Sequence, residues 1–153
     1  MIHSVFSKLL LDLMNQVDST LKEVRMVDRY LGQDQTNVRP AILCPAVLID
    51  IESEQYQDMG CGSQYVEPAT ITVRLCVDNY SASGPKAPQN AREQSMKDFE
   101  LEKALVDCIH GWVPEDNYCT SLVRTEASSE NRNDIGLRIR TITFTTSFED
   151  IDL

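Results

Sequence analysis

The stretch Ala69-Thr-Ile-Thr-Val-Arg-Leu-Cys-Val77 decides the fold, because its side chains alternate strictly between two kinds. Every second residue is apolar, and these residues share one face of an extended chain: Ala69, Ile71, Val73, Leu75 and Val77. The positions between them are mostly polar. A period of two is typical of a β-strand that buries one face and leaves the other in water.

A second strand precedes this one in the segment Pro45-Ala-Val-Leu-Ile-Asp-Ile51. The connection between them, residues 52–67, is too long for a tight turn and too short for a crossover helix. We therefore predict a long antiparallel hairpin against which the other elements pack. Gly60 and Gly62 flank Cys61 and indicate a bend or tip. Since long loops in compact domains are more often functional than accidental, we expect this connection to reach a neighbouring molecule.

Two helices are predicted from apolar side chains at i, i+3, i+4 and i+7 spacing, over residues 2–17 and 90–112. The second helix carries a narrower additional stripe that includes Phe99 and Val106. A second apolar stripe either widens the buried face of a helix or meets another subunit.

Further strands are predicted over residues 22–31, 119–128 and 135–148. The first suits an edge strand, with a continued helix as the alternative. In the last, the apolar side chains change phase after Ile139, which indicates either a β-bulge or a strand covered on both faces. Loops are predicted over 32–39 and 79–89, and a turn over 129–134.

The predicted fold is α+β, an antiparallel or mixed β-sheet with two main helices packed on one face and one long β-hairpin. We expect a single domain over residues 1–153, in which residues 149–153 form a loose acidic tail.

Composition excludes several classes of function. The chain of 153 residues has a net charge of −10, a surface that should repel nucleic acid and anionic membranes. We find no signal peptide and no apolar run of membrane-spanning length. The five cysteines are odd in number and form no CxxC pair, so we expect reduced thiols.

The residues with catalytic potential are few, and each has a plainer interpretation. Cys61 could be a nucleophile, but no histidine is near it in sequence to lower its pKa. His3 and His110 could act in catalysis, although His110 suits a cation at a helix C-terminus. The acids Asp50, Glu52 and Glu54 are predicted on one strand face, where solvation is a simpler role than metal binding. We therefore expect no catalytic residue, no cofactor and no metal.

Two passages and the helix between them carry a family resemblance. The first runs from Pro45-Ala-Val-Leu-Ile-Asp-Ile through Tyr56-Gln-Asp-Met-Gly60 to Ala69-Thr-Ile-Thr-Val-Arg-Leu. The second is Leu122-Val-Arg-Thr-Glu followed by Gly136-Leu-Arg-Ile-Arg-Thr-Ile-Thr-Phe-Thr-Thr-Ser-Phe-Glu-Asp150, and the helix is Phe99-Glu-Leu-Glu-Lys-Ala-Leu-Val-Asp-Cys-Ile-His-Gly-Trp112. This layout, over residues 40–150, resembles the tail-terminator and tail-completion (head–tail joining) proteins of long-tailed bacteriophages.

The resemblance implies a structural protein of the virion tail and neck, assembled in the host cytoplasm. Such proteins form a ring, commonly a hexamer, that caps the head-proximal end of the tail tube, ends its polymerisation and joins tail to head. The implied partners are further copies of the chain, the tail tube protein and a neck or head-completion protein. Genome DNA passes through the lumen without specific binding, and no membrane is involved.

A ring requires contacts between two different patches of the same chain, and the connection and the second helix stripe are candidates. The candidate interface residues are Tyr56, Met59, Cys61, Tyr65, Phe99 and Val106. Acids that approach the lumen would keep it from gripping DNA, and Asp50, Glu52 and Glu54 are the candidates, although a solvated outer surface suits them equally.

Three alternatives stay open. The first is a neck or head-completion adaptor ring at the same junction. The second is a small enzyme that uses Cys61 or His110. The third is a monomeric ligand- or protein-binding domain of the host.

Overall fold

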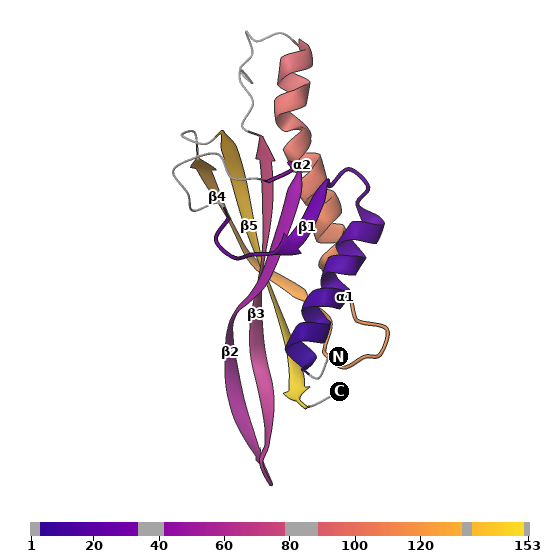
Figure 1. The fold of residues 1–153 in the computed structure, drawn as a ribbon, viewed down its shortest axis with the longest axis vertical. Coiled ribbons are helices and arrows are strands. Elements are labelled where there is room, and N and C mark those ends of the chain that lie inside the picture. Colours follow the sequence, from indigo (N-terminus) through magenta and orange to yellow (C-terminus); the bar gives the residue numbers. More distant parts are fainter. Residues whose placement is uncertain (1–3, 34–41, 79–88, 133–135, 152–153) are drawn as a thin grey trace.

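The computed structural model describes residues 4–33, 42–78, 89–132 and 136–151, which form two helices and a five-stranded mixed sheet. The strand order is β1-β2-β3-β5-β4, and the two helices lie on one side of the sheet (Figure 1). The predicted α+β class, the two helices on one face and the long hairpin are confirmed. The predicted loop over 79–89 falls almost wholly outside the described residues, as does His3.

The hairpin consists of β2 (Ala46–Gly60) and β3 (Ser63–Asp78), which pair from Ala46↔Cys76 to Gly60↔Ser63. Cys61 and Gly62 alone make the turn, with φ of 54° and 81°. These positive values are what a two-residue turn between twisted strands requires. The prediction of a long connection over residues 52–67 is therefore wrong, because β2 and β3 continue through this segment as paired strands and only the turn separates them.

Strand β1 (Met26–Arg29) pairs in parallel with β2 at residues 46–49 and makes the sheet mixed. This confirms an edge strand within residues 22–31 and excludes the continued helix. At the opposite edge lies β4 (Val123–Arg132), which pairs antiparallel with β5 (Leu137–Asp150). The strand predicted over 119–128 thus begins and ends later, and it takes in the start of the turn predicted over 129–134.

Helix α1 (Val5–Thr20) is capped by Ser4, whose hydroxyl oxygen accepts a hydrogen bond from the Phe6 N–H at 3.2 Å. Helix α2 (Gln89–Ile109) is the second predicted helix, and Gly111 with φ of +81° follows its end. Both helices contribute to one core with the sheet residues that face them, among them Leu9, Leu13, Leu105, Ile71, Val73 and Phe144.

A smaller core covers part of the opposite face of the sheet. Ile42, Cys44, Ala46, Leu48, Cys76, Leu137 and Ile139 form it, with Met26 and Tyr30 packed against them. Strand β5 pairs with β3 without a register shift from Leu137 to Thr146, so its change of apolar phase is not a bulge. Leu137 and Ile139 belong to the smaller core and Ile142 and Phe144 to the helix-side core, which confirms a strand covered on both faces.

Candidate functional site

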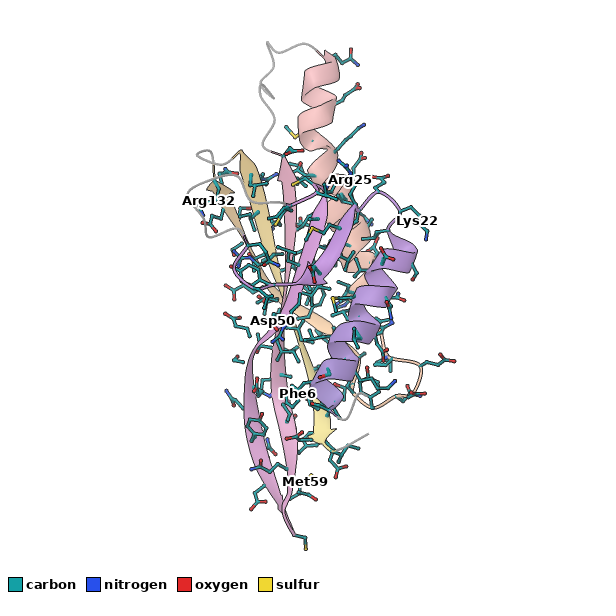
Figure 2. All side chains as sticks on the ribbon, in the orientation of Figure 1. Phe6, Lys22, Arg25, Asp50, Met59 and Arg132 are labelled. Carbon is teal, nitrogen blue, oxygen red and sulfur yellow. The ribbon has the colours of Figure 1, made fainter. Side chains whose placement is uncertain are left out.

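The distal half of the β2–β3 hairpin projects from the body of the molecule as a ribbon, with Met59 near its tip (Figure 2). We call residues 50–68 the ribbon. Tyr56 is 45% exposed and Met59 55% exposed, and Cys61 is exposed in the turn. Tyr65, half-buried, lies on the returning strand opposite Gln57. Four of the candidate interface residues therefore gather on one projecting element.

The ribbon is also strongly acidic. It contains no Lys, Arg or His, and its acids are Asp50, Glu52, Glu54, Asp58 and Glu67. Strand β5 runs beside it to Asp150, which pairs with Gln64, and adds Glu149 and Asp150. The predicted loose tail over 149–153 is therefore strand up to Asp150.

The ribbon acids do not share one face, and the prediction that Asp50, Glu52 and Glu54 do so is wrong. Register shifts interrupt the β2–β3 ladder between Ile51 and Ser53 and between Glu54 and Tyr56. Asp50 lies opposite Thr72 on the face away from the helices, whereas Glu54 lies opposite Ala69 of the helix-side core. Each bulge inserts a residue and so changes which face the next side chain takes.

Asp50 and Glu52 line a hollow of about 420 Å³ on the face of the sheet away from the helices. Its other lining residues are Tyr30, Ile51, Thr72, Arg74, Glu126, Thr141 and Thr143. The cations at this hollow are paired: Arg29 lies 3.2 Å from Asp50, and Arg74 lies 3.7 Å from Glu130 and stacks over the Tyr30 ring at 4.4 Å. The surface is thus polar and weakly acidic, and we call it the open face.

Phe99 and Val106, the remaining interface candidates, differ in exposure. Phe99 is 54% exposed on α2, and Val106 is 8% exposed within the helix-side core. The second stripe therefore widens the buried face at Val106 and leaves the helix surface open at Phe99. Met96, 45% exposed, lies one turn before Phe99 and extends this apolar surface.

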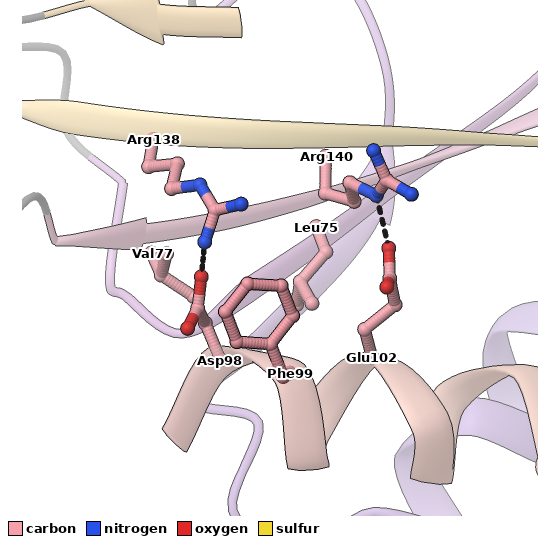
Figure 3. A pocket seen from close by; sticks show the side chains of 7 residues that line it. All are labelled: Leu75, Val77, Asp98, Phe99, Glu102, Arg138 and Arg140. Carbon is pink, nitrogen blue, oxygen red and sulfur yellow. Dashed lines mark hydrogen bonds and ion pairs between the residues drawn. The ribbon is translucent and has the colours of Figure 1, made fainter. Parts of the chain in front are cut away.

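Beneath Phe99, two ion pairs join α2 to β5, and sequence reasoning missed them. Asp98 pairs with Arg138 and Glu102 pairs with Arg140 (Figure 3). The Arg138 guanidinium also lies 5.1 Å from the centre of the Phe99 ring. We call these four charged residues the α2–β5 seam. A signal was available, since the acids are four apart on a helix and the arginines two apart on a strand.

Among the residues with catalytic potential, His110 takes a structural position. His110 Nδ1 accepts a hydrogen bond from the Arg124 backbone N–H at 3.1 Å and ties the end of α2 to β4. Within the described residues, no three His, Cys, Asp or Glu side chains gather as metal ligands, and neither α1 nor α2 is long and apolar enough to span a bilayer.

A polar groove lies between α1 and the segment after α2, where Lys8 reaches both Asp12 at 3.5 Å and Asp116 at 3.1 Å. The Tyr118 hydroxyl donates to Asp12 at 2.6 Å. Burial, and then the Asp12 carboxylate, raise the pKa of Tyr118 far above its ordinary value. These contacts fasten the segment after α2 to α1.

Comparison with known proteins gives a fold. No family model and no curated protein matches the chain. Among solved structures, one chain from a structure described as "Virion of native gene transfer agent (GTA) particle" superposes with a TM-score of 0.54 at 12% sequence identity. The match covers 97% of this chain and 98% of that chain. The two share the whole fold, from end to end.

Proposed function

We propose that this protein is a structural component of a phage-like virion. In its specific form, the proposal is a ring that caps the head-proximal end of the tail tube, ends tube polymerisation and joins tail to head. The observation that carries it is the end-to-end match in fold with a chain of a gene transfer agent particle. The family resemblance of residues 40–150 supplies the position in the tail.

The exposed surfaces suit a ring. A closed ring repeats one heterologous contact, so each subunit needs two different patches. Tyr56 and Met59 form one exposed set on the ribbon, and Met96 and Phe99 form another on α2. The ribbon tip and the first half of α2 lie at opposite ends of the molecule (Figure 1). In the proposed ring, the ribbon of one subunit contacts α2 of the next.

The open face suits a lumen through which DNA passes. Retention of DNA requires Lys and Arg that face phosphates. On this face Arg29 and Arg74 are neutralised by Asp50 and Glu130, and Glu52 and Glu126 add negative charge. We therefore assign Asp50 and Glu52 to the lumen, while Glu54 falls on the other side of the ribbon.

Deletion of the gene from the genome that encodes the particle tests the position of the ring. Electron microscopy should show tails longer than those of the parent if the protein ends polymerisation. Tails of normal length without heads would instead indicate a neck adaptor ring. Normal, filled and joined particles would refute a structural role.

Complementation then tests the surfaces. Tyr56→Ser with Met59→Asp should fail to restore normal tails, whereas Lys22→Ala, an exposed change in the turn after α1, should restore them. Asp50→Lys with Glu52→Lys should permit assembly but reduce DNA delivery, because the new cations retain phosphates. Asp18→Lys and Glu23→Lys, exposed positions at the end of α1 and just after it, are the matched control for charge. Equal delivery by both pairs would contradict the lumen assignment.

A further inference from the structure

Strand β4 forms one edge of the sheet, and among the described residues no strand pairs with its outer side. Every side chain from Val123 to Asn131 is exposed, so both faces of the strand are open as well. The strand is 10 residues long. A long exposed edge presents a row of unpaired N–H and C=O groups and acts as a template for another strand.

On the side of the sheet opposite β4, strand β2 is the edge beyond its pairing with β1, and it differs from β4 in regularity. The ladder of β2 with β3 has register shifts at three places between Ile51 and Gly60, and such bulges protect an edge from pairing. Strand β4 has one shift, between Arg124 and Glu126, and its ladder with β5 is then unbroken from Glu126 to Arg132. The regular part of β4 is therefore the edge suited to accept a strand.

We propose that β4 pairs with β4 of a second copy of this chain, antiparallel about a two-fold axis at Ser129. In this register Glu126 of each copy lies opposite Arg132 of the other, which gives two cross-strand ion pairs. Glu126 and Arg132 lie on the same face, because their partners Thr143 and Leu137 are both at odd positions of the unbroken β5 ladder. Opposite residues of an antiparallel pair share a face, so these side chains meet.

Charge disfavours the two neighbouring registers that keep the faces matched. Shifting the axis to Ser128 sets Glu126 opposite Glu130, and shifting it to Glu130 sets that acid opposite itself. Like charges directly opposite one another destabilise a sheet. The axis at Ser129 is also the register that pairs the whole regular segment, with Ala127 opposite Asn131 and Ser128 opposite Glu130.

The neighbouring charges fit the arrangement. Glu130 lies 3.7 Å from Arg74 of its own chain, which reduces its repulsion of the acids across the axis. The guanidinium of Arg132 has five N–H donors, so it can add a carboxylate to the contacts it already makes. On the other face of β4, small or uncharged side chains meet at the axis. This contact is isologous and is independent of the proposed ring.

Charge reversal tests the two-fold register directly. Glu126→Arg and Arg132→Glu should each weaken self-association about 10-fold or more, because each turns two attractions into repulsions. Mixing the two single variants should restore association, since one chain then carries arginine at both positions and the other carries glutamate at both. The double variant E126R/R132E should also associate as the parent does. Sedimentation at increasing protein concentration measures each association.

Glu23→Arg and Lys22→Glu, two exposed positions in the turn after α1, are the matched controls and should leave association unchanged. Circular dichroism checks that each variant is folded. The proposal is overturned if the parent protein is a monomer at about 1 mM, the weak end of measurable affinity. It is equally overturned if the mixture of the two single variants associates no better than each variant alone. That result is expected if β4 pairs with a different edge of the sheet.

Discussion

The α2–β5 seam should contribute measurably to stability, and Glu102 with Arg140 offers the clearest test. The carboxylate accepts from Arg140 Nε, and Arg140 also donates to Ser129 Oγ at 2.9 Å. The Glu102 side chain is 19% exposed and the Arg140 side chain is 32% exposed. Leu75 lies directly across the β3–β5 ladder from Arg140, so the guanidinium shares its face of the sheet with core residues.

The expected magnitude lies between that of an exposed and that of a fully buried pair. Exposed pairs contribute about 0–1 kcal/mol. Breaking a fully buried pair costs about 3–5 kcal/mol, because one charge is left without a partner. For a pair that is mostly but not fully covered, Glu102→Leu or Arg140→Met should each lower the free energy of unfolding by about 2 kcal/mol.

Replacing both residues should cost much less than the sum of the single changes, because no charge is then stranded. Glu102→Leu with Arg140→Met should therefore cost below about 1 kcal/mol, a coupling near 3 kcal/mol in the double-mutant cycle. Urea unfolding followed by circular dichroism measures this as a shift in midpoint of about 1 M per single variant, at a typical slope near 2 kcal/mol per M.

The control is Lys103 with Asp107, an i,i+4 pair on the same helix that is 78% and 66% exposed. Its removal should cost about 0.5 kcal/mol or less. Additive single-variant costs at Glu102 and Arg140, or costs no larger than this control, would refute the view that the seam holds α2 on the sheet.

Three further predictions concern the turn, a phenol and the core. Cys61→Asn should stabilise the hairpin by about 0.5 kcal/mol, because Asn-Gly is the preferred pair where both central residues of the turn have positive φ. Thermal unfolding measures the change in stability, and Cys61→Val, which should destabilise the hairpin, is the comparison. The pKa of Tyr118 is raised in the folded state, so its contribution to stability should be full below about pH 10 and decline as the pH rises above it; Tyr118→Phe should lack this decline in urea unfolding. Phe148→Ala should cost about 3–5 kcal/mol by leaving a cavity beside Phe6, whose ring centre lies 5.1 Å away, and a loss below about 1 kcal/mol would contradict this core assignment.

Sequence reasoning succeeded where one face of an element is buried and the other is wet. The alternation from Ala69 to Val77 predicted β3, and the apolar stripes predicted both helices, because each pattern reflects a single covered face. Strand β5 has apolar residues in both phases, since each of its faces is covered over part of its length. From the sequence, a β-bulge and a strand covered on both faces explained this change of phase equally well. The unbroken ladder of β5 with β3 decides for the strand covered on both faces.

The ends of the strands in the ribbon and the ends of β4 could not be predicted from a pattern of apolar and polar side chains. From Glu52 to Gly60 and from Val123 to Asn131 nearly every side chain is exposed, so burial imposes no period on the sequence. These segments are strands because of backbone pairing with a neighbour, which leaves little trace in side-chain polarity. Bulges then shift the faces, as they do between Asp50 and Glu54, so the shared face expected for the acids was lost.

The α2–β5 seam depends on a match between the spacing of acidic residues on a helix and the spacing of arginines on a strand. Four residues of a helix rise about 6 Å, and two residues of a strand rise about 6.6 Å. Asp98 and Glu102 on a helix, and Arg138 and Arg140 on a strand, therefore present charges at nearly the same spacing and meet as two parallel pairs. Arginines among the apolar positions of a strand are explicable once a helix with matching acids lies above them. The same spacing fixes where α2 sits along β5, and so where Met96 and Phe99 are presented to a partner.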